Sequence, residues 1–222
     1  MKENPPERQF FFGVSSLLMA RSRYGFDVNK PFSAALLVGG KSTRMGTDKA
    51  WLEVDDRRIP LWQRQSVLLQ ELHPAELFFS GEPRGNYPKS INWVSDAVPN
   101  IGPLGGLVSC LRQCTTESVL ILAVDLARMT SQFAQQLVDT RQPGTGVVPV
   151  IGSSFEPLIA LYPKRALSLA VRHMESGLYR MQELARELVA TGLSTAYPVR
   201  QEDVALFVNW NTPEDRQGER VT

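Results

Sequence analysis

From Leu36 to Lys49 the chain reads LLVGGKSTRMGTDK, in which an apolar run leads into two glycines and three cations. Residues 34–38 have the length and composition of a buried parallel strand. Glycines directly after such a strand allow a tight turn that brings backbone N–H groups against phosphate oxygens. The side chains suited to neutralise those oxygens are Lys41, Arg44 and Lys49. This segment therefore predicts a binding loop for a triphosphate.

Two familiar phosphate-binding motifs do not fit this loop. A P-loop requires a glycine at the position of Ala35, although residues 40–42 supply its Gly-Lys-Ser end. The dinucleotide fingerprint requires alternating glycines, whereas Gly39 and Gly40 are adjacent and the next glycine is Gly46. The loop is therefore of a different kind.

The composition indicates one globular domain that binds a small molecule. The chain has 222 residues, is 43% hydrophobic, and contains no Gly/Ser-rich or charged linker. Its 24 basic and 23 acidic residues nearly cancel, which argues against a nucleic-acid or anionic-membrane partner. No apolar run reaches the ~18 residues of a membrane span. We interpret residues 1–31 as an N-terminal extension, partly disordered, and residues 32–222 as the domain.

The few cysteines and histidines do not indicate a metal centre. Cys110 and Cys114 lie four residues apart on one expected helix, with no further Cys or His ligand nearby, so we expect buried, reduced thiols and a cytoplasmic protein. His73 and His173 each stand alone, outside any ligand spacing. We expect surface or capping roles for both.

Strand-like and helix-like segments alternate after the glycine loop, which is typical of a parallel sheet with helices on both faces. We expect strands at residues 34–38, 75–79, 91–94, 118–124, 146–150, 155–162 and 205–210. We expect helices at residues 61–72, 104–114, 131–139, 164–175 and 178–190, and a further helix that begins at Pro213.

Ligands of open α/β sheets bind beyond the carboxyl ends of the strands, so residues that follow a strand are candidates for the site. Asp125 follows the apolar run 120–124 and is the first charge in eight residues. A carboxylate there is placed to hold Mg²⁺, which binds one or two carboxylates together with substrate phosphates. A turn-capping role for Asp125 is the alternative.

The segment from Asp96 to Gly106 forms a second glycine-rich surface at a strand end. Gly102, Gly105 and Gly106 would let a base or ribose lie close to the backbone at the start of a helix. Asp96 would either join Asp125 at the metal or hydrogen-bond the ribose. A plain Pro/Gly turn is the alternative.

These segments resemble the motifs of the molybdenum cofactor guanylyltransferases, a branch of the nucleotidyltransferases. The opening matches Leu-Ala-Gly-Gly-x-Ser-x-Arg-Met-Gly-x-Asp-Lys except at Val38, and the Asp125 turn matches Asp-Leu-Pro except at Ala127. Residues 96–106 resemble the Asp…Gly-Pro-Leu-Gly-Gly loop. Two later motifs, Glu-Pro-Leu-x-Ala-Leu-Tyr and Phe-x-Asn-x-Asn-Thr-Pro-Glu-Asp, begin at Glu156 and Phe207. The resemblance leaves out the N-terminal extension.

The resemblance implies a Rossmann-like, three-layer α/β nucleotidyltransferase fold with a mostly parallel sheet. It implies transfer of GMP from GTP to molybdopterin with release of pyrophosphate, Mg²⁺ as cofactor, and a molybdoenzyme or cofactor chaperone as a protein partner. The catalytic residues would be Arg44, Lys49 and Asp125, and the metal ligands Asp125 and Asp96. The nucleotide-binding residues would be Leu37, Gly39, Gly40, Lys41, Ser42, Arg44, Lys49, Asp96, Gly102 and Gly105. The second substrate or product would contact Glu156, Asn209 and Asn211.

Two other functions remain open at this point. One is a related nucleotidyltransferase that uses CTP or a sugar phosphate; cytidylyl relatives usually read Leu-Ala-Ala-Gly where this chain has Gly39-Gly40. The other is a non-catalytic nucleotide-binding accessory protein, suggested by the departures at Val38 and Ala127. The presence of Arg44, Lys49 and Asp125 favours an enzyme.

Overall fold

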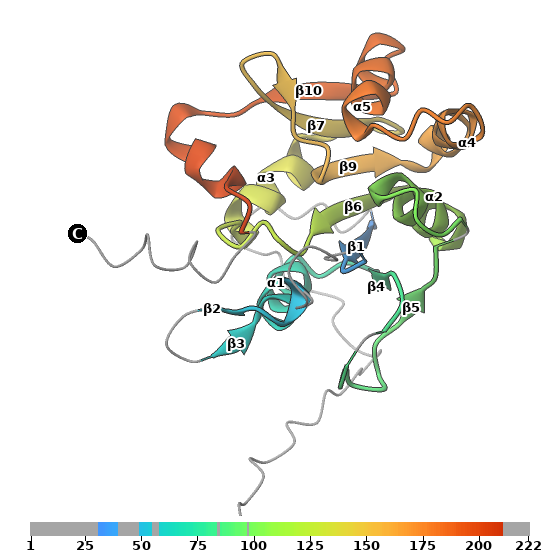
Figure 1. The fold of residues 1–222 in the computed structure, drawn as a ribbon. Helices are drawn as coiled ribbons and strands as arrows, with labels where there is room; N and C mark the ends of the chain where they lie inside the picture. The colour runs from blue at the N-terminus through green and yellow to red at the C-terminus, as the bar shows by residue number, and fades with distance from the viewer. Residues whose placement is uncertain (1–30, 40–48, 55–57, 84, 97, 211–222) are drawn as a thin grey trace, which may run out of the picture.

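The computed structural model describes residues 31–39, 49–54, 58–83, 85–96 and 98–210, and in this part an eight-stranded sheet lies between two layers of helices (Figure 1). The strands of the main path follow the order β10-β7-β9-β6-β1-β4-β5, and β8 pairs with β7. Only β8 and β9 run antiparallel to their neighbours in this described sheet. The expected Rossmann-like fold with a mostly parallel sheet is confirmed. The expected extension lies outside the described residues apart from Pro31.

The strands of the main sheet are short, and β2 and β3 form a separate two-stranded sheet. The strands are β1 Ser33–Leu37, β2 Glu53–Val54, β3 Ile59–Pro60, β4 Glu76–Ser80, β5 Trp93–Val94, β6 Ser118–Ala123, β7 Gly146–Ile151, β8 Ser154–Phe155, β9 Ile159–Pro163 and β10 Ser194–Pro198. The helices are α1 Leu61–Glu71, α2 Pro103–Gln113, α3 Ser131–Thr140, α4 Leu167–Glu175 and α5 Met181–Ala190. Three 3₁₀ helices complete the described elements, namely η1 Lys49–Trp51, η2 Lys164–Ala166 and η3 Gln201–Phe207.

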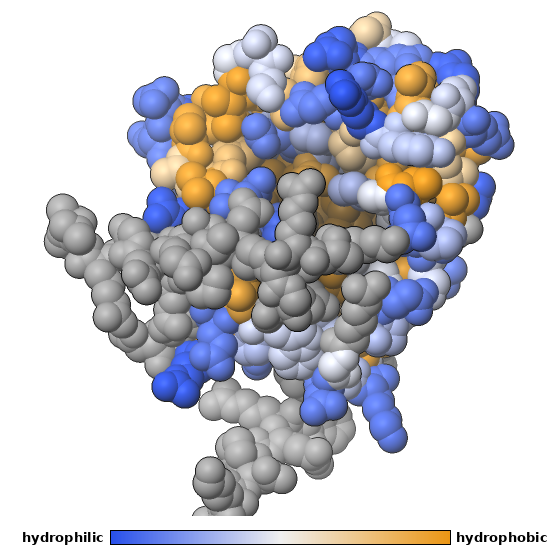
Figure 2. All heavy atoms as spheres, in the orientation of Figure 1, coloured by the Kyte–Doolittle hydropathy of each residue, from blue (hydrophilic) through white to orange (hydrophobic). Residues whose placement is uncertain are grey.

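The central strand β1 is buried on both faces, as its apolar composition predicts. Ala34 and Leu36 belong to the core that packs against α1 and α3, whereas Ala35 and Leu37 belong to the core that packs against α2, α4 and α5. Figure 1 shows these two groups of helices on the two faces of the sheet. On the face shown in Figure 2, polar side chains are prominent around the rim, and apolar ones form several patches between them. Among the helices described, none is long and apolar enough to cross a membrane.

The register of the four adjacent parallel strands β6, β1, β4 and β5 aligns their carboxyl ends. Leu37 pairs with Ala123 on one side and with Ser80 on the other, and Ser80 pairs with Val94. The residues that follow these strands therefore lie along one edge of the sheet, which is where ligands of such folds bind.

The strand expectations differ from the structure at three places of the main sheet. Residues 205–210 are not a strand, because η3 occupies 201–207 and the following three residues pair with no strand. Glu202 and Asp203 in the first turn of η3 favour a helix start there. The expected strand 155–162 is interrupted by a turn at residues 156–158 and forms β8 and β9. β10 was not expected, because this edge strand is mostly exposed and lacks an apolar pattern.

The cysteines fit the expectation of buried thiols, since Cys110 and Cys114 are both buried and free. Burial raises the pKa of the Cys110 thiol to about 12. A thiol with so high a pKa is protonated at neutral pH and is a poor nucleophile.

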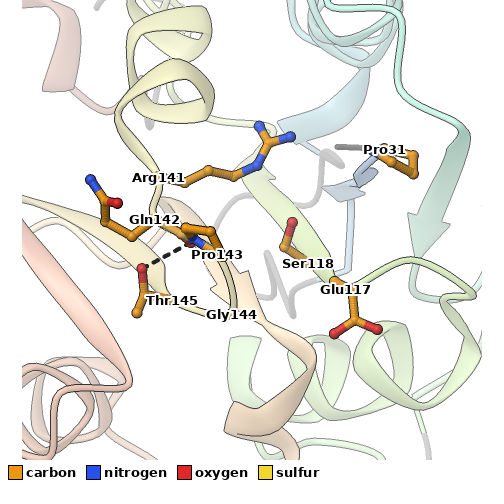
Figure 3. A pocket seen from close by; sticks show the side chains of 8 residues that line it. All are labelled: Pro31, Glu117, Ser118, Arg141, Gln142, Pro143, Gly144 and Thr145. Carbon is orange, nitrogen blue, oxygen red and sulfur yellow. Dashed lines mark hydrogen bonds between the residues drawn. The ribbon is translucent and has the colours of Figure 1, made fainter. Parts of the chain in front are cut away.

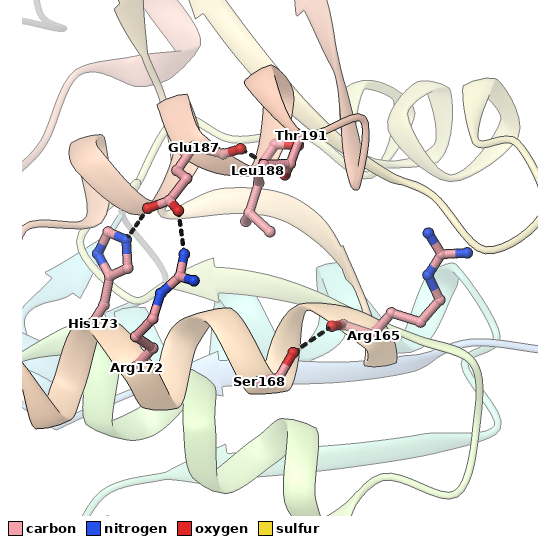
Figure 4. A network of polar contacts seen from close by, with 7 residues as sticks. All are labelled: Arg165, Ser168, Arg172, His173, Glu187, Leu188 and Thr191. Atoms are coloured by element: carbon pink, nitrogen blue, oxygen red, sulfur yellow. Dashed lines mark hydrogen bonds and ion pairs between the residues drawn. The ribbon is translucent and has the colours of Figure 1, made fainter.

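His173 does not have the expected surface role. Its ring is only 3% exposed, and Nε2 lies 2.6 Å from Oε2 of Glu187, which joins α4 to α5 (Figure 4). Arg172, the preceding residue of α4, also donates a hydrogen bond to Glu187. In the described structure Nδ1 of His173 is buried without a hydrogen-bond partner. The carboxylate of Glu187 is therefore the polar link between these two helices in Figure 4.

We expect Glu187→Gln to lower the melting temperature near neutral pH. The difference in melting temperature between wild type and the variant, here called the margin, should become smaller at acidic pH. The hydrogen bond with His173 holds the pKa of the Glu187 carboxyl below its usual range, and Arg172 lowers it further. A lowered folded-state pKa stabilises the fold above the unfolded-state pKa, about 4.3 for Glu, and this contribution is lost as the pH falls through the folded-state pKa. Melting curves of both proteins between about pH 3 and about pH 7 measure the margin.

The matched control is Glu183→Gln, one turn earlier on α5. We expect the melting temperature of Glu183→Gln to differ from that of wild type by a smaller margin than that of Glu187→Gln, and this margin should change less with pH. An unchanged margin for Glu187→Gln across the pH range would contradict the assigned link.

Candidate functional site

The carboxyl edge is the edge of the sheet at which β6, β1, β4 and β5 end. The loops that leave it are held by backbone hydrogen bonds that extend the strand pairing beyond the last strand residues. The N–H groups of Val38 and Gly39 both donate to the carbonyl oxygen of Ser80, each at 3.1 Å. The N–H of Gly81 donates to Val94, and the N–H of Val124 donates to Leu37, also at 3.1 Å. The backbone directions at the start of these loops are therefore fixed by the sheet.

Gly39 and Gly81 pass so close to each other that side chains do not fit between them. A Cβ on Gly81 would lie 2.9 Å from the backbone N of Gly39, and Gly81 has φ +127°. A Cβ on Gly39 would lie 3.3 Å from the Cα of Gly81. The close approach of β1 and β4 thus requires glycine at position 81 and leaves little room for a side chain at Gly39, the first glycine of the expected phosphate loop. The predicted residues Gly40, Lys41, Ser42 and Arg44 lie outside the described residues, and their roles stay predictions.

Lys49 and Asp125 meet at this edge although they are distant in the sequence. Lys49 begins η1, Asp125 follows β6, and Nζ lies 3.4 Å from Oδ2. Their side chains are 28% and 21% exposed, so both can reach a ligand. Partly exposed ion pairs contribute at most about 1 kcal/mol to stability, so the pair matters more for charge at the edge than for the fold.

The turn after Asp125 is fixed by α1. Gln65 is fully buried, and its side-chain amide donates to the carbonyl oxygen of Leu126 at 2.5 Å. Arg64 donates to the carbonyl oxygen of Met129 at 3.3 Å. These contacts hold the turn at Ala127, where the resembling family has proline. Sequence reasoning missed Gln65, because nothing beside it in the chain indicates its partner.

The C-terminal segment lies against Asp125. The N–H of Trp210 donates to the carbonyl oxygen of Asp125 at 2.9 Å, and Trp210 is only 4% exposed and belongs to the core. Asn209 precedes Trp210 and is exposed, so this predicted residue is one position away from the backbone contact with Asp125. Asn211 lies outside the described residues.

Asp96 is half-buried at the end of β5 and is held by Ser80. The hydroxyl of Ser80 donates to Oδ1 of Asp96 at 3.2 Å. Burial raises the pKa of the Asp96 carboxyl, and the nearby Glu82 raises it further. Ser80 was missed as a site residue, although it follows an apolar run directly, which is the position that identified Asp125.

The start of α2 packs directly on this pair. A Cβ on Gly106 would lie 2.5 Å from the Ser80 hydroxyl oxygen, and a Cβ on Gly105 would lie 3.1 Å from the carbonyl oxygen of Val98. Gly102 precedes the helix with φ +75°, and no side chain caps the helix N-terminus. The second glycine surface therefore lies directly against Ser80 and Asp96.

Glu156 lies at the same edge on the other side of β6. Because β9 runs antiparallel to β6, Ile159 pairs with Leu122, and the N–H of Ala123 donates to Leu158 at 2.8 Å. The buried Tyr162 hydroxyl donates to the carbonyl oxygen of Pro157 at 2.8 Å, which anchors this loop. Burial raises the pKa of the Glu156 carboxyl. The predicted residues thus flank Asp125 on both sides.

The carboxylates at this edge suit an open Mg²⁺ site, which is completed by substrate and water, better than a metal site made of protein ligands alone. In the described part of the chain no three His, Cys, Asp or Glu side chains gather closely enough to hold a metal. Mg²⁺ needs only one or two carboxylates, with phosphate oxygens and water completing its shell. The partly exposed Asp125 offers such a ligand.

A hollow of about 190 Å³ lies at the opposite edge of the sheet (Figure 3). Glu117 and Ser118 at the start of β6 line it, together with Thr145 before β7 and Arg141 after α3. Small-molecule sites usually occupy about 300 to 1,000 Å³. Among the predicted site residues that the structure describes, none lines this hollow, so it is not the candidate site.

The family model and the most similar relatives that we compared with this chain indicate the same family. The family model of the MobA-like NTP transferase domain matches residues 34–196. A probable molybdenum cofactor guanylyltransferase of Opitutus terrae is 33% identical over 193 residues, which cover 85% of this chain and 94% of that protein. A molybdenum cofactor guanylyltransferase of Xanthomonas euvesicatoria is 30% identical over 84% of this chain and 93% of that protein.

Solved structures share the fold at lower identity. Molybdopterin-guanine dinucleotide biosynthesis protein A of Archaeoglobus fulgidus superposes with a TM-score of 0.66 at 21% identity, covering 84% of this chain and 95% of that chain. A cytidylyltransferase of Thermus thermophilus that acts on 2-C-methyl-D-erythritol 4-phosphate gives a TM-score of 0.60 at 13% identity, covering 84% of this chain and 98% of that chain. Together with the match of the family model to most of the chain, these likenesses show that the protein is a nucleotidyltransferase of the MobA-like NTP transferase family.

Proposed function

We propose that this enzyme transfers GMP from GTP to the terminal phosphate of molybdopterin and releases pyrophosphate. The observation that carries this proposal is the Lys49–Asp125 pair, which stands at the carboxyl edge of the sheet where β1 ends in Gly39. The names of the curated relatives supply the substrates. Delivery of the product to a molybdoenzyme or a cofactor chaperone belongs to the same proposal.

The reaction depends on alignment of the two substrates and on neutralisation of their phosphate charges more than on proton transfer. The acceptor phosphate oxygen attacks the α-phosphorus of GTP, the bond from that phosphorus to the bridging oxygen breaks, and pyrophosphate leaves. Because the acceptor is already an anion, no general base is needed. The protein has to hold two polyanions in line and stabilise the charge that develops on the leaving group.

Residues on the β1 side of the edge suit the triphosphate. The Gly39 backbone lies at the start of the phosphate loop, and the Lys49 ammonium is held 3.4 Å from Asp125, where it can donate to a phosphate oxygen. We assign Arg44 and Lys41 to the same phosphates. These contacts neutralise the leaving pyrophosphate, which is the main requirement of the step.

Asp125 and Asp96 suit different roles. Two strands separate β6 from β5, so the strands are about 14 Å apart at a spacing of about 4.8 Å. We therefore assign Mg²⁺ to Asp125 and a ribose hydroxyl to Asp96. When bound, Mg²⁺ would supply positive charge to the phosphates. The hydrogen bond from Ser80 leaves lone pairs on Asp96 that can accept from the ribose.

The second substrate fits the β9 side of Asp125. Glu156 lies in the loop before β9, and Asn209 lies beside Asp125. We assign both residues, with Asn211, to molybdopterin or the product. Neutral amides add hydrogen bonds at this side without raising the positive charge.

The first prediction about the reaction concerns the nucleotide. We expect GTP with Mg²⁺ to raise the melting temperature more than CTP, ATP or UTP at the same concentration, because a ligand that binds only the folded state stabilises it by mass action. Thermal-shift measurements with and without Mg²⁺ give the comparison. Equal shifts for GTP and CTP would contradict the guanylyl assignment, since cytidylyltransferases share this fold.

The second prediction concerns Asp125. We expect Asp125→Asn to lower turnover by roughly 10²-fold or more, because each ~1.4 kcal/mol of lost transition-state stabilisation is tenfold in rate. The melting temperature should hardly change, since the ion pair with Lys49 is partly exposed. The measurement is pyrophosphate release from GTP and molybdopterin over a Mg²⁺ titration.

Asp139→Asn on α3 is the matched control, because this aspartate lies outside the proposed site and accepts a hydrogen bond from Gln135 on its own helix. Near-normal turnover of Asp125→Asn at low Mg²⁺ would show that Asp125 is only a turn residue.

A further inference from the structure

Five aromatic side chains form a continuous cluster beside the candidate site. Tyr87 contacts the other four rings, with centroids 4.9 Å from Trp51, 5.1 Å from Trp62 and 5.0 Å from Trp93. Phe79, which is 2% exposed, connects this aromatic cluster to β4 and to the core. The aromatic cluster thus joins η1, α1, β4 and β5.

Within the aromatic cluster, Trp51 is the residue that lies next to the carboxyl edge of the sheet. It ends η1, the three-residue 3₁₀ helix that begins with Lys49. So short a helix does not hold its own conformation, and its place has to come from tertiary contacts. Ala50 is fully buried, and the N–H of Leu52 donates to the carbonyl oxygen of Lys49 at 3.0 Å. The backbone at Lys49 is therefore tied to the position of Trp51.

The loop between β4 and β5 closes over the Trp51 ring. Gly85 has φ +97°, and a Cβ there would lie 3.0 Å from the indole of Trp51. The same loop contributes Tyr87 and leads through Trp93 to Asp96. Trp51 is thus clamped between this loop and Trp62 of α1, whose ring centroid is 5.8 Å away.

We infer that Trp51 is a positioning residue for Lys49, acting through η1. The aromatic cluster fixes the indole, the indole fixes η1, and η1 places the Lys49 ammonium 3.4 Å from Asp125. The consequence for catalysis rests on the proposed function, whereas the placement of Lys49 does not depend on it. The aromatic cluster also connects the Lys49 side of the site to the Asp96 side through one loop.

The placement is tested in nucleotide-free protein by the rate at which acetic anhydride acetylates Lys49, measured by mass spectrometry. We expect Trp51→Ala to raise this rate by roughly threefold or more, because local opening frees the amine from its fixed position. Trp51→Phe keeps a ring in the aromatic cluster and should restore a rate near that of wild type. Tyr197→Ala is the control, because it removes a half-buried ring from the separate contact with Phe133.

An unchanged rate in Trp51→Ala, or an equal rise in Tyr197→Ala, would overturn the inference. Comparable melting temperatures of Trp51→Ala and Tyr197→Ala exclude general unfolding as the cause. If Trp51→Ala does not fold, Trp51→Leu replaces it in the same comparison.

The consequence for binding is tested by a double-mutant cycle on the dissociation constant of a non-hydrolysable GTP analogue with Mg²⁺. We expect Trp51→Ala to weaken binding about tenfold in wild type and to have little further effect in Lys49→Ala, because residues that act through one group are not additive. Fully additive losses would overturn the inference. A wild-type protein that binds no guanine nucleotide would contradict the proposed function instead, and the acetylation rates would still decide the placement.

Discussion

Leu37 at the end of β1 pairs with Ser80 on one side and with Ala123 on the other, and the candidate site depends on this parallel register. Because β5 runs in the same direction beside β4, four loops leave the sheet at one edge. A slip of one residue in any of these pairs would turn the alternating side chains to the opposite face. The register is therefore what brings Lys49, Asp125 and Asp96 to the same edge.

The apolar runs predicted the sheet because its central strands are buried on both faces. Residues 34–38 and 118–124 read as continuous apolar segments, and β1 and β6 are found there. Residues 194–198 were not predicted as a strand because they form an exposed edge strand, and the strand predicted at 205–210 was wrong because residues 205–207 end a 3₁₀ helix. In such segments the hydrophobic period is weak, and tertiary contacts decide the backbone.

The same reasoning explains which candidate site residues the sequence indicates. Asp96 and Asp125 stand at the ends of apolar strands, so the sequence alone indicates them. Ser80 and Gln65 act through Asp96 and Leu126, which lie 16 and 61 residues away in the chain, and no local pattern indicates those partners. Glycine pairs such as Gly39 and Gly81 show the same dependence, since the close approach exists only once β1 and β4 are paired.

The central claim is that the nucleotide and its metal bind at the carboxyl edge, with Asp125 as the metal ligand. The most direct measurement is a crystal structure with a non-hydrolysable GTP analogue and Mn²⁺ in place of Mg²⁺, with Mn²⁺ located by its anomalous scattering. We predict a peak at about 2.1 Å from a carboxylate oxygen of Asp125, with the analogue's phosphates between Gly39 and Lys49. A peak away from Asp125, or an analogue bound in the hollow lined by Glu117 and Arg141, would contradict the account.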